Sequence, residues 1–184
     1  GSMDPQQRLL LELGYTSLHG SSHRRATLMG GDSGVFVGME RPDWMIAQPP
    51  SARNSVYCAG DNVSAAAGRV SFVLGLKGPC FSVTTVCSSS LVALDAAAPN
   101  LQFGRCSSAL VGGVNMISDP VGFLAYGQAL APDGKCKTFD GTANGLGRGD
   151  ACGAVVLRAV SSRAEDAVIA GGSGVNQDGR SASM

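Results

Sequence analysis

The sequence predicts an α/β fold built on a mostly parallel sheet. Segments rich in β-branched and apolar residues alternate with segments of helical periodicity, which is the order expected of a parallel sheet with crossover helices. The composition agrees, because 26 glycines and only 5% aromatic residues suit closely packed layers better than a helical bundle. With 184 residues, of which 44% are hydrophobic, the chain is long enough for one domain with its own core.

The first part of the chain is predicted to contain two helices around one buried strand. Residues 3–13 have leucines at helical spacing and Pro5 where a first turn tolerates it, so they are predicted to form a helix. Residues 17–32 are rich in serine, glycine, histidine and arginine and are predicted to be a polar connection. The elements that follow are a strand at 35–38, an irregular proline-containing segment at 41–55 and a helix at 62–75.

The second part continues the alternation. Strand formers at 81–86 run into a helix that begins at Ser88 and is expected to end near Ala98, because Pro99 disfavours helix in the residue before it. The later elements are a strand at 109–114, a helical pattern at 120–130, a tight turn at 132–134, and strands at 154–158 and 168–170 around a polar helix-like stretch at 161–166.

Cys87 lies where the predicted strand meets the predicted helix, in the run PCFSVTTVCSSSLVAL. A side chain on such a turn stands clear of the sheet, while the first N–H groups and the dipole of the helix favour negative charge. The placement resembles the nucleophile elbow of hydrolases, with sulfur in place of a serine oxygen. The local pattern alone leaves two interpretations equal: a nucleophile, whose thiolate needs that electrostatic help, or a buried structural thiol, the usual role of a cysteine.

Charge and hydropathy exclude several classes of function. The 14 basic and 14 acidic residues cancel, so nothing indicates binding to nucleic acid or to an anionic membrane surface. The apolar runs are far too short to span a bilayer. No secretory signal opens the chain, and Gly1-Ser2 ahead of Met3 is typical of an expression scar, so a cytoplasmic location is expected.

The sequence does not favour a metal-binding or a phosphate-binding site. The six cysteines are scattered singly, with no Cys-x-x-Cys pair and no nearby histidine, so free thiols are expected rather than a zinc site. His19 and His23 are four residues apart, but Gly20 and the neighbouring serines favour a solvated loop over a metal-binding helix face. The glycine-rich run at 141–153 lacks the lysine of a phosphate-binding loop and is predicted to form tight turns.

The residues around Cys87 resemble the active-site motif of β-ketoacyl synthases, most closely the ketosynthase domains of modular polyketide synthases and animal-type fatty acid synthases. The motif here is TVCSSSLVAL at 85–94. Further blocks of that family occur in the family's order along essentially the whole chain from Met3. They are MDPQQR at 3–8, GVFVG at 34–38, AGRVS at 67–71, GGVN at 112–115, PDGKCKTFD at 132–140 and GVNQDGRS at 174–181.

The resemblance implies a thiolase-like fold, in which two similar βαβαβαββ halves stack into a five-layered core that forms a homodimer. Residues 3–184 would hold most of the first half and the start of the second, as the N-terminal part of a ketosynthase domain. It also implies a reaction in which an acyl group passes from the phosphopantetheine arm of an acyl carrier protein to Cys87. A malonyl-type thioester is then decarboxylated, and its carbanion attacks the acyl-enzyme. The Cys87 N–H would bind the oxyanion, and no cofactor or metal of the domain itself is expected.

Two histidines and a lysine complete that site in the family, and they come from motifs that this chain does not contain. A free cysteine with a pKa of about 8.5 is only ~3% thiolate at neutral pH, and ~90% thiolate requires about 3.4 kcal/mol of stabilisation. A helix dipole supplies about 0.3–1 kcal/mol, and up to about 2 in good geometry. The chain alone is therefore expected to acylate slowly and not to complete the condensation.

The sequence departs from the family at several positions. Thr84-Thr85-Val86 stands where the family usually has Asp-Thr-Ala, and Asp150-Ala151 replaces a more usual Glu-Gly. Pro99 interrupts a helix that ordinarily continues. These departures bear on substrate shape and competence rather than on the family.

Two alternatives remain beside an acyl-transferring, condensing enzyme. A truncated, non-catalytic paralogue that acts as a dimerisation or carrier-protein-docking module would account for the missing histidines, although retention of Cys87 counts against it. A thiolase or chain-transfer enzyme of the same fold is disfavoured, because its cysteine motif differs and the block at 132–140 is not expected there.

Overall fold

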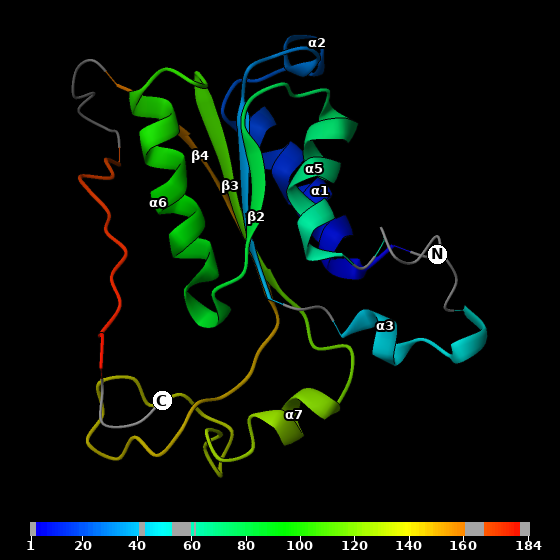
Figure 1. Cartoon of the computed structure of the whole chain (residues 1–184), viewed down its shortest axis with the longest axis vertical. Helices are drawn as coiled ribbons and strands as arrows, with labels where there is room; N and C mark the ends of the chain where they lie inside the picture. Colours follow the sequence, from blue (N-terminus) through cyan, green and yellow to red (C-terminus); the bar gives the residue numbers. More distant parts are fainter. Residues whose placement is uncertain (1–2, 41–42, 53–59, 61, 161–167, 181–184) are drawn as a thin grey trace.

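A four-stranded mixed sheet forms the centre of the structure (Figure 1). The computed structural model describes residues 3–40, 43–52, 60, 62–160 and 168–180. The strand order is β2-β1-β3-β4, with β2, β1 and β3 parallel and β4 antiparallel to β3. The bounds are Gly34–Met39 for β1, Cys80–Val83 for β2, Ser108–Asn115 for β3 and Ala151–Arg158 for β4. The predicted α/β class with a mostly parallel sheet is confirmed.

Three long helices cover the two faces of this sheet. They are α1 (Pro5–Gly20), α5 (Val63–Leu74) and α6 (Ser89–Gln102). Figure 1 shows α1 and α5 on one face and α6 on the other. Leu18 and Val70 belong to the apolar core on the first face, and Phe36 and Ala93 belong to the core under α6. Because both faces are covered, all six residues of β1 are buried.

The helices on the first face begin and end at capping residues. Asp4 accepts a hydrogen bond from the Gln6 N–H at 2.7 Å at the start of α1. Asn62 accepts one from the Ser64 N–H at 3.0 Å at the start of α5. Gly75 ends α5 in the left-handed conformation, with φ of 69°. The helices predicted at these two places are confirmed.

Helix α1 is longer than the sequence predicts. A polar connection is expected from residue 17 onward, yet the helix continues to Gly20 because Leu18 is fully buried and the Ser17 hydroxyl donates to the Ala154 carbonyl at 3.4 Å. Packing against the sheet outweighs the preference of serine and glycine for a loop. The rest of the predicted connection contains the short helix α2 (Arg25–Leu28).

Pro99 does not end α6, contrary to the prediction that the helix stops near Ala98. The helix runs on to Gln102 with the proline inside it. Asn100 and Leu101 are buried in this last turn, and the Asn100 amide donates to the Ala96 carbonyl at 2.8 Å. The stabilisation gained from burying the last turn therefore exceeds the cost of the helical hydrogen bond that the proline removes.

Between β1 and α5, and between β3 and β4, the described residues form short helices. These are α3 (Trp44–Ala47), the 3₁₀ helix η1 (Pro50–Ala52) and α7 (Val121–Ala125). The irregular segment predicted at 41–55 is confirmed in its described part. The helical pattern predicted at 120–130 is only partly correct, since the chain forms turns after α7. The glycine-rich run before β4 is irregular and contains turns, as predicted.

The C-terminal part differs from the prediction in two ways. β4 begins at Ala151, earlier than expected, because it pairs with β3 along the whole of that strand. No strand forms at 168–170 within the described residues, and Val168 is fully exposed there. A short apolar run forms a strand only where a sheet edge accepts it.

Some predictions concern residues that the structure does not describe. They are the expression scar at residues 1–2, the helix-like stretch at 161–166 and Cys58. In the described part of the chain, no helix is both long and apolar enough to cross a membrane.

Candidate active site

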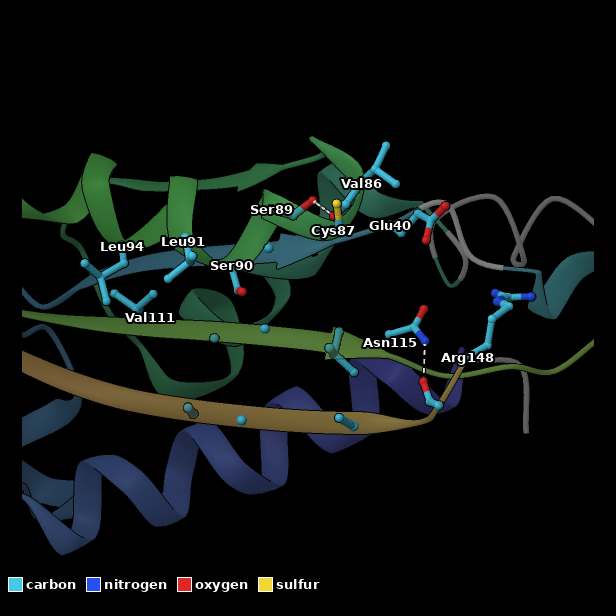
Figure 2. A pocket seen from close by; sticks show the side chains of 18 of the residues that line it. Glu40, Val86, Cys87, Ser89, Ser90, Leu91, Leu94, Val111, Asn115 and Arg148 are labelled. Carbon is cyan, nitrogen blue, oxygen red and sulfur yellow. Dashed lines mark hydrogen bonds between the residues drawn. The ribbon is translucent and has the colours of Figure 1, made fainter. Parts of the chain in front are cut away.

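A groove of about 910 Å³ opens between the start of α6 and the carboxyl ends of β1 and β3 (Figure 2). Cys87 lies at its edge, in the 3₁₀ turn η2 (Val86–Ser88) that links β2 to α6, and the residue is exposed. Leu91 and Leu94 of α6 form one wall, and Val111 of β3 lies opposite them. The predicted strand-to-helix junction is present and brings the thiol to a groove with apolar walls.

The turn before Cys87 is strained and held by hydrogen bonds. Val86 has φ of 58°, a left-handed conformation that β-branched residues rarely adopt. The Ser89 hydroxyl donates to the Val86 carbonyl at 2.7 Å and accepts the Thr85 N–H at 2.8 Å. The Ser88 hydroxyl donates to the Thr85 carbonyl at 2.8 Å. The serines after the cysteine therefore fix the turn that presents it.

A row of three glycines across the sheet makes room for this turn. Gly38 of β1, Gly113 of β3 and Gly153 of β4 are neighbours in register. A Cβ atom on Gly38 would lie 2.4 Å from the backbone of Ser89 and Ser90, and one on Gly113 would lie 2.7 Å from the Ser90 Cβ. The start of α6 rests on the sheet only because these two positions have no side chain. A Cβ atom on Gly153 would meet nothing within 4 Å, so the row is open there and lines the groove.

The other described cysteines differ from Cys87 in their surroundings. Burial raises the pKa of the Cys106 and Cys152 thiols, which makes them weaker nucleophiles. Cys80 and Cys136 are exposed, but neither lines the groove. The interpretation of Cys87 as a buried structural thiol is wrong, because among the described cysteines it alone is both exposed and part of the groove.

The mouth of the groove carries a carboxylate, a phenol and a guanidinium. Glu40, directly after β1, accepts a hydrogen bond from the Tyr126 hydroxyl at the end of α7. The Arg148 guanidinium lies 5.1 Å from the Tyr126 ring centroid and 5.2 Å from that of Phe123. The hydrogen bond to Glu40 raises the pKa of Tyr126, and burial adds to the effect. Figure 2 shows Glu40 at the same end of the groove as Cys87, with Arg148 across the opening.

The loop from β3 to α7 is held by side chains from three distant segments. Four successive N–H groups, at residues 116–119, donate to these side chains. Gln6 accepts the first at 3.1 Å, Asp150 accepts the second at 2.7 Å, and the Asp43 carboxylate accepts the last two at 2.9–3.0 Å. No local pattern in the sequence indicates Asp43 as a residue that supports the site. Gln6 and Asp150 stood in noted motifs, but nothing local indicates their partners.

His19 and His23 lie at the other end of the strands. His23 Nε2 is 3.4 Å from the Ser108 hydroxyl at the start of β3, and its Nδ1 is 3.1 Å from Arg158. His19 Nε2 is 3.0 Å from Arg24, and His19 is in the last turn of α1 rather than in the predicted loop. The length of β3 separates His23 from Asn115 at the mouth of the groove by about 20 Å. The described residues contain no group of three or more His, Cys, Asp or Glu side chains that could hold a metal ion.

Comparison with known proteins assigns the chain to a family. The profile described as "Beta-ketoacyl synthase, N-terminal domain" matches residues 1–163. The chain belongs to the β-ketoacyl synthase family. Highly reducing polyketide synthase dmxL2 of Cryptosporiopsis sp. (strain 8999) is 42% identical over 97% of this chain and 8% of the relative. Spectinabilin polyketide synthase system protein NorC of Streptomyces orinoci is 41% identical over 98% of this chain and 8% of the relative.

Solved ketosynthases have the same fold. The ketosynthase from module 6 of the bacillaene synthase from Bacillus subtilis 168 gives a TM-score of 0.73 at 34% identity, over 86% of this chain and 27% of that one. The oxazolomycin ketosynthase domain OzmH KS7 of Streptomyces albus JA3453 gives a TM-score of 0.74 at 31% identity, over 85% of this chain and 29% of that one. The predicted thiolase-like fold and the assignment to the N-terminal part of a ketosynthase domain are confirmed. This ketosynthase chain spans under a third of those structures and under a tenth of the curated relatives.

Two departures from the ketosynthase pattern contribute to the site instead of disrupting it. The Thr84 hydroxyl donates to the Met39 carbonyl at 3.0 Å, so it ties the chain just before the cysteine turn to the end of β1. Asp150 accepts the Ile117 N–H and so helps to hold the loop after β3. Both positions keep a polar side chain with a partner in the structure.

Proposed function

We propose that this chain is the acyl-accepting part of a polyketide ketosynthase, with Cys87 as its nucleophile. The observation that carries the proposal is an exposed thiol on a strained strand-to-helix turn, at the edge of a groove with apolar walls. A cysteine that serves only packing needs neither exposure nor a groove. The polyketide synthase relatives support acyl thioesters as the substrate class.

In the proposed transfer the Cys87 thiolate attacks the carbonyl carbon of an acyl thioester. A C–S bond forms to Cys87, and the carbonyl electron pair moves onto oxygen. The tetrahedral oxyanion then collapses, the C–S bond to the donor breaks, and the departing thiolate takes up the proton that Cys87 lost. The Cys87 N–H has no acceptor among the described residues, which supports its proposed role as a donor to the oxyanion.

The groove offers a place for the acyl chain. Leu91 is 70% exposed and Val155 is 48% exposed, although both are apolar and both line the groove. An acyl chain that covers them gains about 25 cal/mol for each Å² of apolar surface removed from water. The groove therefore favours an acyl group with a hydrocarbon portion.

Decarboxylation and condensation belong to the intact synthase in this proposal. The chain has two histidines, and both lie at the end of the sheet opposite to Cys87 and the mouth of the groove. Delivery by the phosphopantetheine arm of an acyl carrier protein, a malonyl-type extender and a homodimeric intact domain are parts of the same proposal, supported by the family. No geometry favours a non-catalytic docking module, since docking does not require a strained turn that exposes a thiol.

Peptide mapping of the full chain after incubation with an acyl N-acetylcysteamine thioester tests the proposal. We expect the acyl mass on the peptide that contains Cys87 and only background labelling in Cys87→Ala. Cys80→Ala is the matched control, because Cys80 is an exposed cysteine on the preceding strand that does not line the groove. Labelling that persists in Cys87→Ala, or that maps to Cys80 or Cys136, would falsify the proposal.

A further inference from the structure

The short helix α7 lies near the mouth of the groove and is held there by side-chain contacts more than by burial. None of its residues is buried, and Val121, Phe123 and Leu124 are 43–83% exposed. The loop before α7 is fixed by the Asp43 carboxylate, and the residue after it is Tyr126, which bonds to Glu40. An element with so little buried apolar surface opens at low energetic cost.

The Tyr126–Glu40 hydrogen bond joins the two sides of the mouth next to Cys87. Its partners are 86 residues apart and come from the end of α7 and the end of β1. Both side chains line the groove together with Cys87. The pKa of Tyr126 is raised mainly by this bond, and a charged Cys87 thiolate adds to the rise.

Arg148 holds the Tyr126 ring in the orientation that this bond needs. Its guanidinium stacks on the rings of Phe123 and Tyr126, which lie three residues apart on one side of α7. Gly122 makes room for the guanidinium, since a Cβ atom there would lie 2.1 Å from Arg148 Nη1. That nitrogen is buried and finds no hydrogen-bond partner in the described part of the chain. A buried donor without a partner is costly, so this unpaired nitrogen lowers the stability of the closed arrangement.

We propose that Tyr126 is a specificity-determining latch, whose hydrogen bond to Glu40 holds the end of α7 against the end of β1 at the mouth of the groove and restricts access of long acyl chains to Cys87. The inference rests on the proposed function. A small acyl group reaches the exposed thiol while the bond is closed. A long chain must pass the mouth to reach the α6 wall, and it is admitted when the bond opens and the Tyr126 side chain moves away.

A comparison of acyl donors of different length tests the latch in the full chain. The measured quantity is the ratio of the second-order rate constants for octanoyl and acetyl N-acetylcysteamine thioesters, with alkylation by iodoacetamide as the measure of reactive thiol. Tyr126→Phe keeps the ring and its stacking on Arg148 but removes the hydroxyl. We expect it to raise the octanoyl-to-acetyl ratio about fivefold, the equivalent of one ordinary hydrogen bond.

Further variants identify the bond as the cause. Glu40→Ala should raise the ratio by the same factor, and the double variant should give no further increase, because both substitutions remove one shared bond. Tyr15→Phe is the matched control, since Tyr15 is a half-exposed tyrosine on α1 outside the groove. It should leave the ratio at the wild-type value.

The outcomes separate this inference from the proposed function. An unchanged ratio in Tyr126→Phe and Glu40→Ala, with the acyl group on Cys87, overturns the latch and leaves the acyl-accepting role intact. An equal rise in the rate constants for octanoyl transfer, acetyl transfer and iodoacetamide alkylation also overturns the latch, because it shows an effect on the reactivity of the Cys87 thiol itself. An acyl group that maps away from Cys87 in every protein overturns the proposed function.

Discussion

The presentation of Cys87 depends on the backbone of the residue before it. Val86 has φ of 58°, and the left-handed conformation costs an L-residue with a Cβ atom about 1–2 kcal/mol. The Ser89 hydroxyl accepts from the Thr85 N–H and donates to the Val86 carbonyl, and these two hydrogen bonds offset part of this cost. Strain of this kind persists where the surrounding structure imposes it, and it is concentrated at functional sites.

Replacement of Val86 by glycine should stabilise the chain by roughly 0.5–1 kcal/mol. Glycine adopts a positive φ without strain, although its greater freedom in the unfolded state cancels part of the gain. Val86→Ala keeps the Cβ atom and should gain less. Urea denaturation of the two variants and the wild type measures their free energies of unfolding. If Val86→Gly is less stable than Val86→Ala, the turn is not strained.

The sequence predicts the local part of the site and not its distant partners. The position of Cys87 follows from strand formers before it and helix formers after it, all within one stretch of chain. Its catalytic role stays a prediction. Glu40 and Tyr126 are 86 residues apart, and neither belongs to a local pattern that indicates a bond between them. Their pairing depends on how β1 and α7 are placed in the tertiary structure.

At the scale of elements, prediction succeeds where local pattern and burial agree. β1 is an apolar strand buried on both faces, and α5 has a capping asparagine and a terminal glycine at the ends of an apolar repeat. It fails where packing opposes the local pattern, as at Pro99 inside α6. It fails also where an apolar run such as residues 168–170 finds no sheet edge.

The contact of α6 with the sheet should be sensitive to a single methyl group at Gly38. Gly38→Ala places a Cβ atom 2.4 Å from the backbone of Ser89 and Ser90, and neither backbone can yield without moving the start of α6. We expect a loss of about 1–3 kcal/mol in urea denaturation and slower acylation of Cys87.

Gly153→Ala is the matched control for this substitution. Gly153 belongs to the same row of the sheet, but its added Cβ atom meets nothing within 4 Å. Its stability should stay within about 0.5 kcal/mol of the wild type. Equal losses of stability in Gly38→Ala and Gly153→Ala would show that the start of α6 does not pack against the glycine row.

At the scale of the whole molecule, polar side chains join segments that are far apart in the sequence. Gln7 donates to the Asn62 carbonyl at 3.2 Å and accepts from Arg69 at 2.5 Å, so it ties α1 to the start and the middle of α5. Gln6 and Asp43 reach the loop between β3 and α7. Two of the sequence blocks that mark the family, at 3–8 and 67–71, thus meet through the Gln7–Arg69 contact. The sequence shows the blocks, whereas the contacts between them require the fold.

Asp43 should contribute more stability than its position beside a short helix indicates. Its carboxylate accepts the N–H groups of Ser118 and Asp119, 75 and 76 residues away, at 2.9–3.0 Å. Asp43→Ala leaves both donors unpaired in a partly buried loop and should cost about 2–3 kcal/mol in urea denaturation.

Hydrogen exchange at Ser118 and Asp119 should accelerate by more than the global loss of stability explains, because the loop loses its anchor. Asp140→Ala is the control, since among the described residues the Asp140 carboxylate bonds only to Thr142 in its own turn. If Asp43→Ala costs no more than Asp140→Ala and exchange in the loop is unchanged, the loop is held by its own backbone rather than by the carboxylate.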